Sequence, residues 1–214
     1  ALASAGAAPP PTSVANVESW DGSSWTETAD VNTARNIVGG SGTSTSTLIF
    51  GGRSPNKANT ESWNGTAWTE VSDLASARYG IGSAGASNTS SLAFGGVAPG
   101  GDTNATEEYD GTNWTTGGNY VVAVKENSAG GGPQTSGYVA GGAAPSATAI
   151  CGLYDGTTWS TTAALPGAQQ LNGGTSNNTG PAGAMSFGGG TDKDATYEFT
   201  QESLAVTAKS LAST

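Results

Sequence analysis

The chain contains no histidine and only one cysteine, Cys151, in its 214 residues. These absences exclude imidazole bases, nucleophilic triads that use histidine, and zinc sites built on histidine and cysteine. A lone cysteine also excludes an intrachain disulfide framework. The sequence therefore lacks the residues of the commonest catalytic and metal-binding sites, and we predict neither a cofactor nor a metal ion.

Positive charge is scarce as well. Seven lysines and arginines stand against 17 aspartates and glutamates, which gives a formal net charge of −10. An acidic chain is repelled by phosphate backbones and by anionic lipid surfaces, so we expect no nucleic-acid partner. No stretch approaches the roughly 18 apolar residues of a membrane span, and the first residues lack the basic start of a secretory signal. We therefore expect no membrane insertion.

Glycine is abundant, with 34 residues, and this composition disfavours helices. The most informative feature is an internal repeat about 45 residues long. The segments VESWDGSSWTE, TESWNGTAWTE, TEEYDGTNWTT and GLYDGTTWSTT recur at this spacing, and TYEFTQESLAV is a degraded fifth copy in which Leu204 replaces the second aromatic residue. Upstream of each copy a short apolar run ends in two glycines, as in LIFGG, LAFGG, YVAGG and MSFGG, with LASAG as a worn version.

Each repeat predicts four short antiparallel strands. Runs such as TLIF and SLAF have the alternation and the β-branched or aromatic residues of half-buried strands. Asp-Gly or Asn-Gly pairs, as at Asp21 and Asn64, separate two aromatic-bearing runs and predict hairpin turns, which also account for Asp110 and Asp155 without a calcium site. The first strand of each unit is expected to begin near Arg35, Arg78, Lys125 or Gln169.

A repeat of this length, with four strands, a glycine pair and an aromatic hairpin, resembles the kelch motif of β-propellers. The resemblance implies an all-β fold, a kelch-type β-propeller of four-stranded antiparallel blades, with five blades. In kelch folds the glycine pair ends the second strand and the aromatic residues pack between blades, so Trp68 and Trp114 are expected to be largely buried between adjacent sheets. A ring of six or seven blades, completed by upstream sequence, is the alternative.

The resemblance covers the whole chain, 1–214, as a single propeller. The expected divisions are a partial first blade at 1–28, blades at 33–71, 76–117 and 121–162, and a degraded last blade at 167–208.

Propellers that are enzymes need residues that this chain lacks. Copper oxidases resembling galactose oxidase bind copper through imidazole and tyrosine, and no histidine is present. Sialidase-like propellers use an arginine cluster, whereas this chain has only Arg35, Arg53 and Arg78. We expect Arg35 and Arg78 to anchor the start of an inner strand by hydrogen bonds to neighbouring blades, and we predict that the chain is not an enzyme.

The loops between second and third strands are the expected contact surface, because they differ in length and charge while the strands around them repeat. They hold three of the seven basic residues and contain no Trp, Tyr or Phe, which favours protein contacts over carbohydrate binding. The candidate contact residues are Arg53, Pro55, Asn56, Lys57, Asp102, Asn104, Asp192, Lys193 and Asp194.

The particular residues of the repeats, such as TESWNGTAWTEVSDLASAR followed by SLAFGG, are similar to kelch-like proteins of marine tailed phages, especially cyanophages. This resemblance implies a non-enzymatic structural or adhesion protein of the virion, a tail fibre, appendage or decoration component. Its partners would be other virion proteins or a host-surface receptor such as a glycan. The first alternative is a secreted, extracellular bacterial kelch propeller that binds carbohydrate or protein, and the second is a hydrolase or lyase that uses carboxylates alone.

Overall fold

The computed structural model describes residues 1–9, 12–125 and 129–170, and from there on the strands at 173–175, 185–187, 195–200 and 205–210. These residues form antiparallel β-sheets and contain no α-helix, only a single 3-10 turn, η1 (Gln134–Ser136). No membrane-spanning helix occurs in the part of the chain that the structure describes. The prediction of an all-β chain with four-stranded antiparallel sheets is confirmed.

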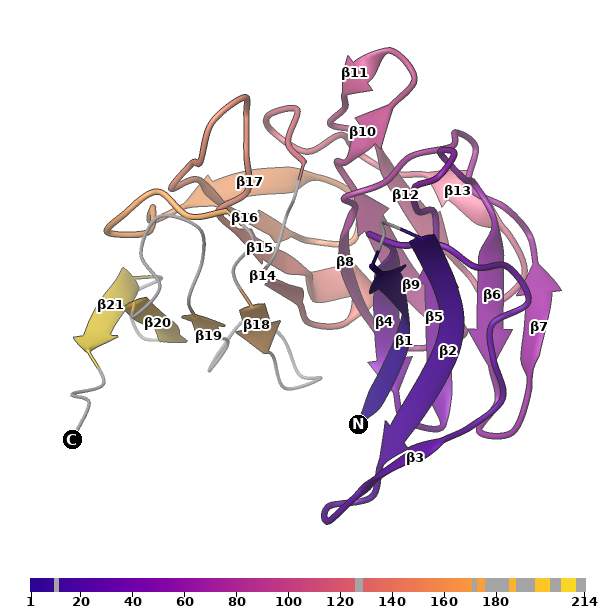
Figure 1. Cartoon of the computed structure of the whole chain (residues 1–214). Coiled ribbons are helices and arrows are strands. Elements are labelled where there is room, and N and C mark those ends of the chain that lie inside the picture. The colour runs from indigo at the N-terminus through magenta and orange to yellow at the C-terminus, as the bar shows by residue number, and fades with distance from the viewer. Residues whose placement is uncertain are drawn as a thin grey trace.

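Five sheets follow one another along the chain, one for each repeat (Figure 1). The first sheet has three strands, β1 (Leu2–Ala8), β2 (Thr12–Trp20) and β3 (Trp25–Glu27). The second sheet has the order β4 (Gly39–Thr43), β5 (Ser46–Phe50), β6 (Thr60–Trp63) and β7 (Trp68–Val71). The third sheet has the order β8 (Gly82–Ser87), β9 (Ser90–Phe94), β12 (Thr106–Tyr109) and β13 (Trp114–Thr116).

The fourth sheet consists of β14 (Ala129–Gly131), β15 (Tyr138–Ala140), β16 (Cys151–Tyr154) and β17 (Trp159–Thr162). The fifth consists of β18 (Gly173–Thr175), β19 (Met185–Phe187), β20 (Ala195–Thr200) and β21 (Ala205–Ser210). A small hairpin of β10 (Val97–Ala98) and β11 (Gly101–Asp102) projects from the loop between β9 and β12 (Figure 1).

The first strands of the second to fifth sheets lie side by side: β4 packs against β8, β8 against β14, and β14 against β18. Glycine permits this approach, because a Cβ atom on Gly130 would lie 2.4 Å from the carbonyl oxygen of Ser83 in the neighbouring sheet. The glycine-rich composition of the first strands therefore follows from the convergence of the sheets.

These first strands begin later than the sequence predicts, at Gly39 and Gly82 rather than near the preceding arginines. The reason is a left-handed backbone at Ile37 (φ 52°) and Gly80 (φ 62°), which interrupts the extended chain between each arginine and its strand. Only isolated bridges, such as the one between Asn36 and Arg53, form in the interrupted part.

Tryptophans at the start of the fourth strands connect the second, third and fourth sheets to the part of the chain that precedes each of them. Trp68 and Trp159 are buried, with 7% and 8% exposure, whereas Trp114 is only half-buried, less than expected. The indole N–H of Trp68 donates to the carbonyl oxygen of Ala29, and those of Trp114 and Trp159 donate to the hydroxyl groups of Thr60 and Thr106. Thr60 and Thr106 belong to the preceding sheet, and Ala29 lies in the connection that follows the first sheet, so the tryptophans fix the packing between sheets.

The predicted turn chemistry is present in the hairpins between third and fourth strands. The Oδ1 atom of Asp21 accepts hydrogen bonds from the backbone N–H groups of Ser23 (2.7 Å) and Ser24 (2.9 Å). Asn64 makes the same pair of bonds in the second repeat, as do Asp110 and Asp155 in the third and fourth. An amide thus serves as well as a carboxylate at this position.

We expect the Asp21 carboxyl to titrate with a pKa of about 2, because the backbone N–H groups of Ser24 and Ser23 stabilise its ionised form. Since this pKa lies below the ordinary value of 3.8, the stability that the bonds contribute is present above that value and is lost as the pH falls through about 2. A carboxyl-carbon NMR titration measures this pKa. Asp21→Asn, which copies Asn64, should retain the turn, and a measured pKa near 3.8 would contradict the prediction.

Candidate functional site

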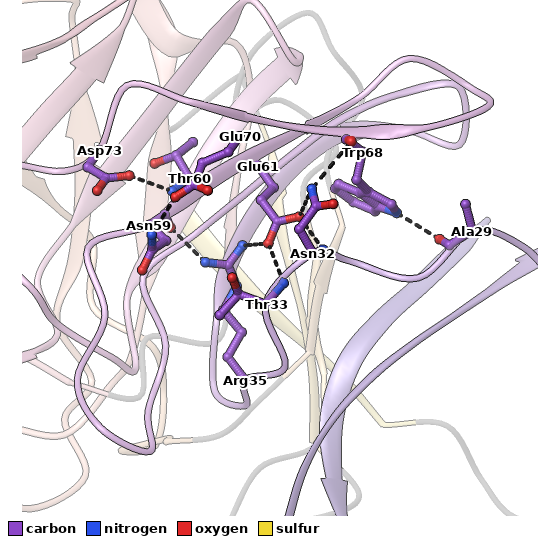
Figure 2. A network of polar contacts seen from close by, with 10 residues as sticks. All are labelled: Ala29, Asn32, Thr33, Arg35, Asn59, Thr60, Glu61, Trp68, Glu70 and Asp73. Atoms are coloured by element: carbon purple, nitrogen blue, oxygen red, sulfur yellow. Dashed lines mark hydrogen bonds and ion pairs between the residues drawn. The ribbon is translucent and has the colours of Figure 1, made fainter.

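A buried ion pair lies in the second sheet (Figure 2), and another lies at the equivalent place in the third, each with an arginine from the segment that leads into the first strand. The Nη2 atom of Arg35 lies 2.8 Å from Oε1 of Glu61, and its Nη1 atom donates to the carbonyl oxygen of Asn59 (2.9 Å). Arg78 and Glu107 repeat this geometry at 2.7 Å. Burial lowers the pKa of both guanidinium groups, while the facing glutamates oppose that shift.

The expectation that these arginines bond to neighbouring sheets holds for their backbone and not for their side chains. The carbonyl oxygens of Arg35 and Arg78 accept hydrogen bonds from the backbone N–H groups of Gly6 and Gly52 in the preceding repeats. The guanidinium groups instead bind groups of the sheet that each arginine enters. Both side chains are almost entirely buried, and their terminal nitrogens bind the protein while each Nε atom is left without a hydrogen-bond partner, so we assign them a structural role.

The two glutamates also hold the connection that leads into their sheet. The Oε2 atom of Glu61 accepts hydrogen bonds from the backbone N–H of Asn32 (2.7 Å) and from its side-chain amide, and Oε2 of Glu107 accepts one from the backbone N–H of Ala75 (2.8 Å). Sequence reasoning missed these residues. The available signal was a glutamate two positions before the hairpin aromatic in the first three repeats.

In the fourth sheet, the segment that leads into the first strand packs on the third strand without an ion pair among the described residues. Val124 occupies the arginine position, since its carbonyl oxygen accepts from Gly96 just as that of Arg78 accepts from Gly52. Gly152 replaces the glutamate, and the ring of Tyr120 fills the space, because a Cβ atom on Gly152 would lie 2.5 Å from Cε2 of Tyr120. The second and third sheets therefore place a buried arginine at this position, and the fourth sheet fills the same space with valine and tyrosine.

The loop between β5 and β6 is the best-defined part of the predicted contact surface. The glycine pair ends β5, and the backbone N–H of Gly52 donates to the carbonyl oxygen of Arg78 (2.9 Å). The backbone N–H of Arg53 donates to Asn36 O (2.8 Å), and that of Lys57 donates back to Gly52 O (2.9 Å). These bonds attach the loop to two inter-sheet connections, so it presents its side chains from a fixed backbone.

Arg53 is exposed near the start of this loop, and its guanidinium carbon lies 5.1 Å from the centre of the Tyr79 ring, a cation–π arrangement. Beside it lies a cavity of about 580 Å³ lined by Gly6, Ala7, Asn36, Ile37, Arg53 and Ser54. Ile37 is 46% exposed there, in the left-handed conformation that a β-branched residue rarely adopts. The structure thus brings an aromatic ring, a guanidinium and an aliphatic side chain together, although the loops themselves contain no aromatic residue.

Arg53 has no ion-pair partner among the described residues, and neither does Lys57. Lys125, in contrast, lies 3.5 Å from Asp102, and Arg35 and Arg78 are paired in the interior. In a protein with a net charge of −10, Arg53 is therefore a local positive site on an acidic background.

The remaining candidate contact residues differ in their surroundings. Pro55 is exposed after a cis peptide bond. Asn56 donates to Val97 O (3.4 Å) and Asn104 to Tyr120 O (3.0 Å), so both amides support loop structure. Asp102 lies in the β10–β11 hairpin, which sequence reasoning missed although the Pro-Gly-Gly segment before it is a turn signal. The other three candidates lie outside the described residues: Asp192, Lys193 and Asp194.

Cys151 lies inside the fourth sheet and is buried, as expected for a small hydrophobic residue. Burial raises the pKa of its thiol to about 11, so the thiol is protonated at neutral pH. Within the part of the chain that the structure describes, no group of three or more His, Cys, Asp and Glu side chains could hold a metal ion.

Comparison with known proteins assigns no family to the chain. No protein-family model matches it, and no curated protein is significantly similar to it.

Proposed function

We propose that the chain is a five-bladed kelch-type β-propeller that serves as a non-enzymatic structural or adhesion protein of a phage virion. Support for the propeller comes from the repeated sheets, from the neighbouring positions of β4, β8, β14 and β18, and from the tryptophans of the second, third and fourth sheets, which bond to the preceding part of the chain. Support for the virion comes from the similarity of the repeats to kelch-like phage proteins.

The observation that carries a binding role is the environment of Arg53. Its guanidinium is exposed and free of any ion pair within the described residues, and it is held over Tyr79 by a loop with a fixed backbone. A guanidinium presents planar, paired N–H donors that match a carboxylate, and arginine and aromatic residues are enriched where proteins bind one another. The adjacent cavity and exposed Ile37 add apolar surface.

The partner that fits this site is an anionic group with apolar neighbours. A carboxylate on another virion protein or on a host-surface receptor has this chemistry, and its attraction to Arg53 would oppose the repulsion from the acidic remainder of the protein. The loop between β5 and β6 would then determine where the partner docks.

Immunogold electron microscopy of purified phage particles, with an antibody raised against this chain, tests the virion assignment. Labelled particles are the expected result. The assignment would be contradicted if the particles stayed unlabelled and the protein were found only in soluble form, in the medium of infected or of uninfected bacterial cultures.

Arg53→Ala should reduce attachment of the fluorescently labelled protein to host cells or to particles that lack it by about tenfold or more, because arginines at the centre of interfaces contribute strongly. Lys125→Ala is the matched control. It also removes one positive charge, but the charge of Lys125 is already neutralised by Asp102. Equal effects of the two substitutions would show that net charge, and not the Arg53 site, controls attachment.

A further inference from the structure

The first sheet lacks the inner strand that each of the four other sheets possesses. Its strand β1 has the same register as β5 in the second sheet: Ser4 pairs with Val17 and Ala3 with Glu18, as Phe50 pairs with Thr60 and Ile49 with Glu61. In the second sheet the other edge of β5 is covered by β4, with Gly39 opposite Phe50. The corresponding edge of β1 has no neighbouring strand among the described residues.

This open edge borders a groove. A cavity of about 510 Å³ is lined by Ala1, Leu2 and Ser4 of the β1 segment and by residues of the second sheet, mainly from Val38 to Ser44. Leu2 and Ser4 are half-buried and Ala3 is exposed, whereas their counterparts in β5 and β9 are buried: Leu48, Ile49, Phe50, Leu92, Ala93 and Phe94. Since first strands of adjacent sheets pack side by side elsewhere, a strand in this groove would contact both β1 and β4.

A single carboxylate marks the same position. Glu18 occupies the place of Glu61 and Glu107, the buried partners of Arg35 and Arg78. Glu18 is exposed, and it has no ion-pair partner among the residues that the structure describes. The first sheet thus keeps the carboxylate of this ion pair. In the second and third sheets the arginine of the pair comes from the segment that leads into the inner strand.

We propose that the edge of β1 binds one further extended segment of the first-strand type, in which an arginine is followed after three residues by glycine, as in ARNIVGG, and that this arginine pairs with Glu18. The bound segment would complete a four-stranded sheet by strand addition, in which main-chain hydrogen bonds supply affinity and the ion pair supplies register. The first strands β4, β8, β14 and β18 already form the edges of their own sheets, so the occupant is an additional copy of this type.

A synthetic peptide of residues 33–43, TARNIVGGSGT, is the probe, and fluorescence anisotropy with the whole chain measures its binding. Glu18→Gln should weaken binding by about tenfold or more, the effect of losing a charge-assisted hydrogen bond. Glu27→Gln, a carboxylate on the outer strand β3 opposite Glu18, is the matched control and should leave binding unchanged. A peptide with Glu in place of Arg35 should regain affinity for the Glu18→Arg protein.

Hydrogen exchange should show protection of residues 2–8 when the peptide binds. In a second variant, residues 33–46 are fused directly before Ala1, which copies the connection that joins β4 to β5. This fusion should raise the melting temperature, and Glu18→Gln should make that increase smaller. The proposal is overturned if the fusion does not stabilise the chain, if both glutamate substitutions act equally, or if the chain dimerises through β1 and the peptide does not compete.

Discussion

Trp159→Ala should lower the free energy of unfolding by about 3 to 5 kcal/mol, the usual cost of removing a large aromatic side chain from a core. The indole packs edge-on against Phe94 at 4.8 Å and against Tyr120 at 5.0 Å, and its N–H donates to Thr106 Oγ1 at 2.9 Å. The cavity would therefore open between the third and fourth sheets, where no small shift of one side chain can close it. Urea denaturation followed by circular dichroism measures the loss.

Trp25 provides the matched control, because it holds the same place in the hairpin of the first sheet. It is 50% exposed, and its ring packs on that of Trp20, with ring centres 5.5 Å apart. Trp25→Ala should therefore change stability by less than about 1 kcal/mol, as is typical of exposed positions. A loss as large as that of Trp159→Ala would show that another sheet covers Trp25, as in a closed ring.

Local sequence signals predict the sheets well, because each strand and hairpin is determined by residues close together in the chain. The spacing of apolar runs, glycine pairs and Asp-Gly or Asn-Gly turns locates β5, β6 and β7 in the second sheet and their counterparts in the third. The sequence likewise predicts only a partial blade at 1–28, and the sheet observed there has three strands.

Contacts between distant residues are less accessible to sequence reasoning. The left-handed turn at Ile37 has no local signal, since a β-branched residue is among the least suited to it, and this turn both delays β4 and exposes Ile37 beside Arg53. Tyr79 reaches Arg53 from another repeat, so the loop sequence alone does not contain the aromatic part of the site. A residue pattern that repeats predicts the scaffold, whereas the site depends on where repeats meet.

The buried ion pair of the third sheet leads to the second large effect. Glu107→Gly should lower the free energy of unfolding by about 3 to 5 kcal/mol, because it leaves the guanidinium of Arg78 buried and uncompensated. The same substitution leaves the backbone N–H of Ala75 without the hydrogen bond that it donates to Glu107 in the unsubstituted protein. Thermal and urea denaturation measure the loss.

The fourth sheet indicates how this loss can be recovered. Leu74 corresponds to Tyr120, since the backbone N–H of Leu74 donates to Ala58 O as that of Tyr120 donates to Asn104 O. The triple variant Leu74→Tyr, Arg78→Val, Glu107→Gly therefore copies Tyr120, Val124 and Gly152. We expect it to be more stable than Glu107→Gly alone, because no charge remains buried and the tyrosine ring fills the space of the lost side chains. If the triple variant were less stable than the single one, the two junctions would not be interchangeable, and the Arg–Glu pair would be required by the third sheet itself.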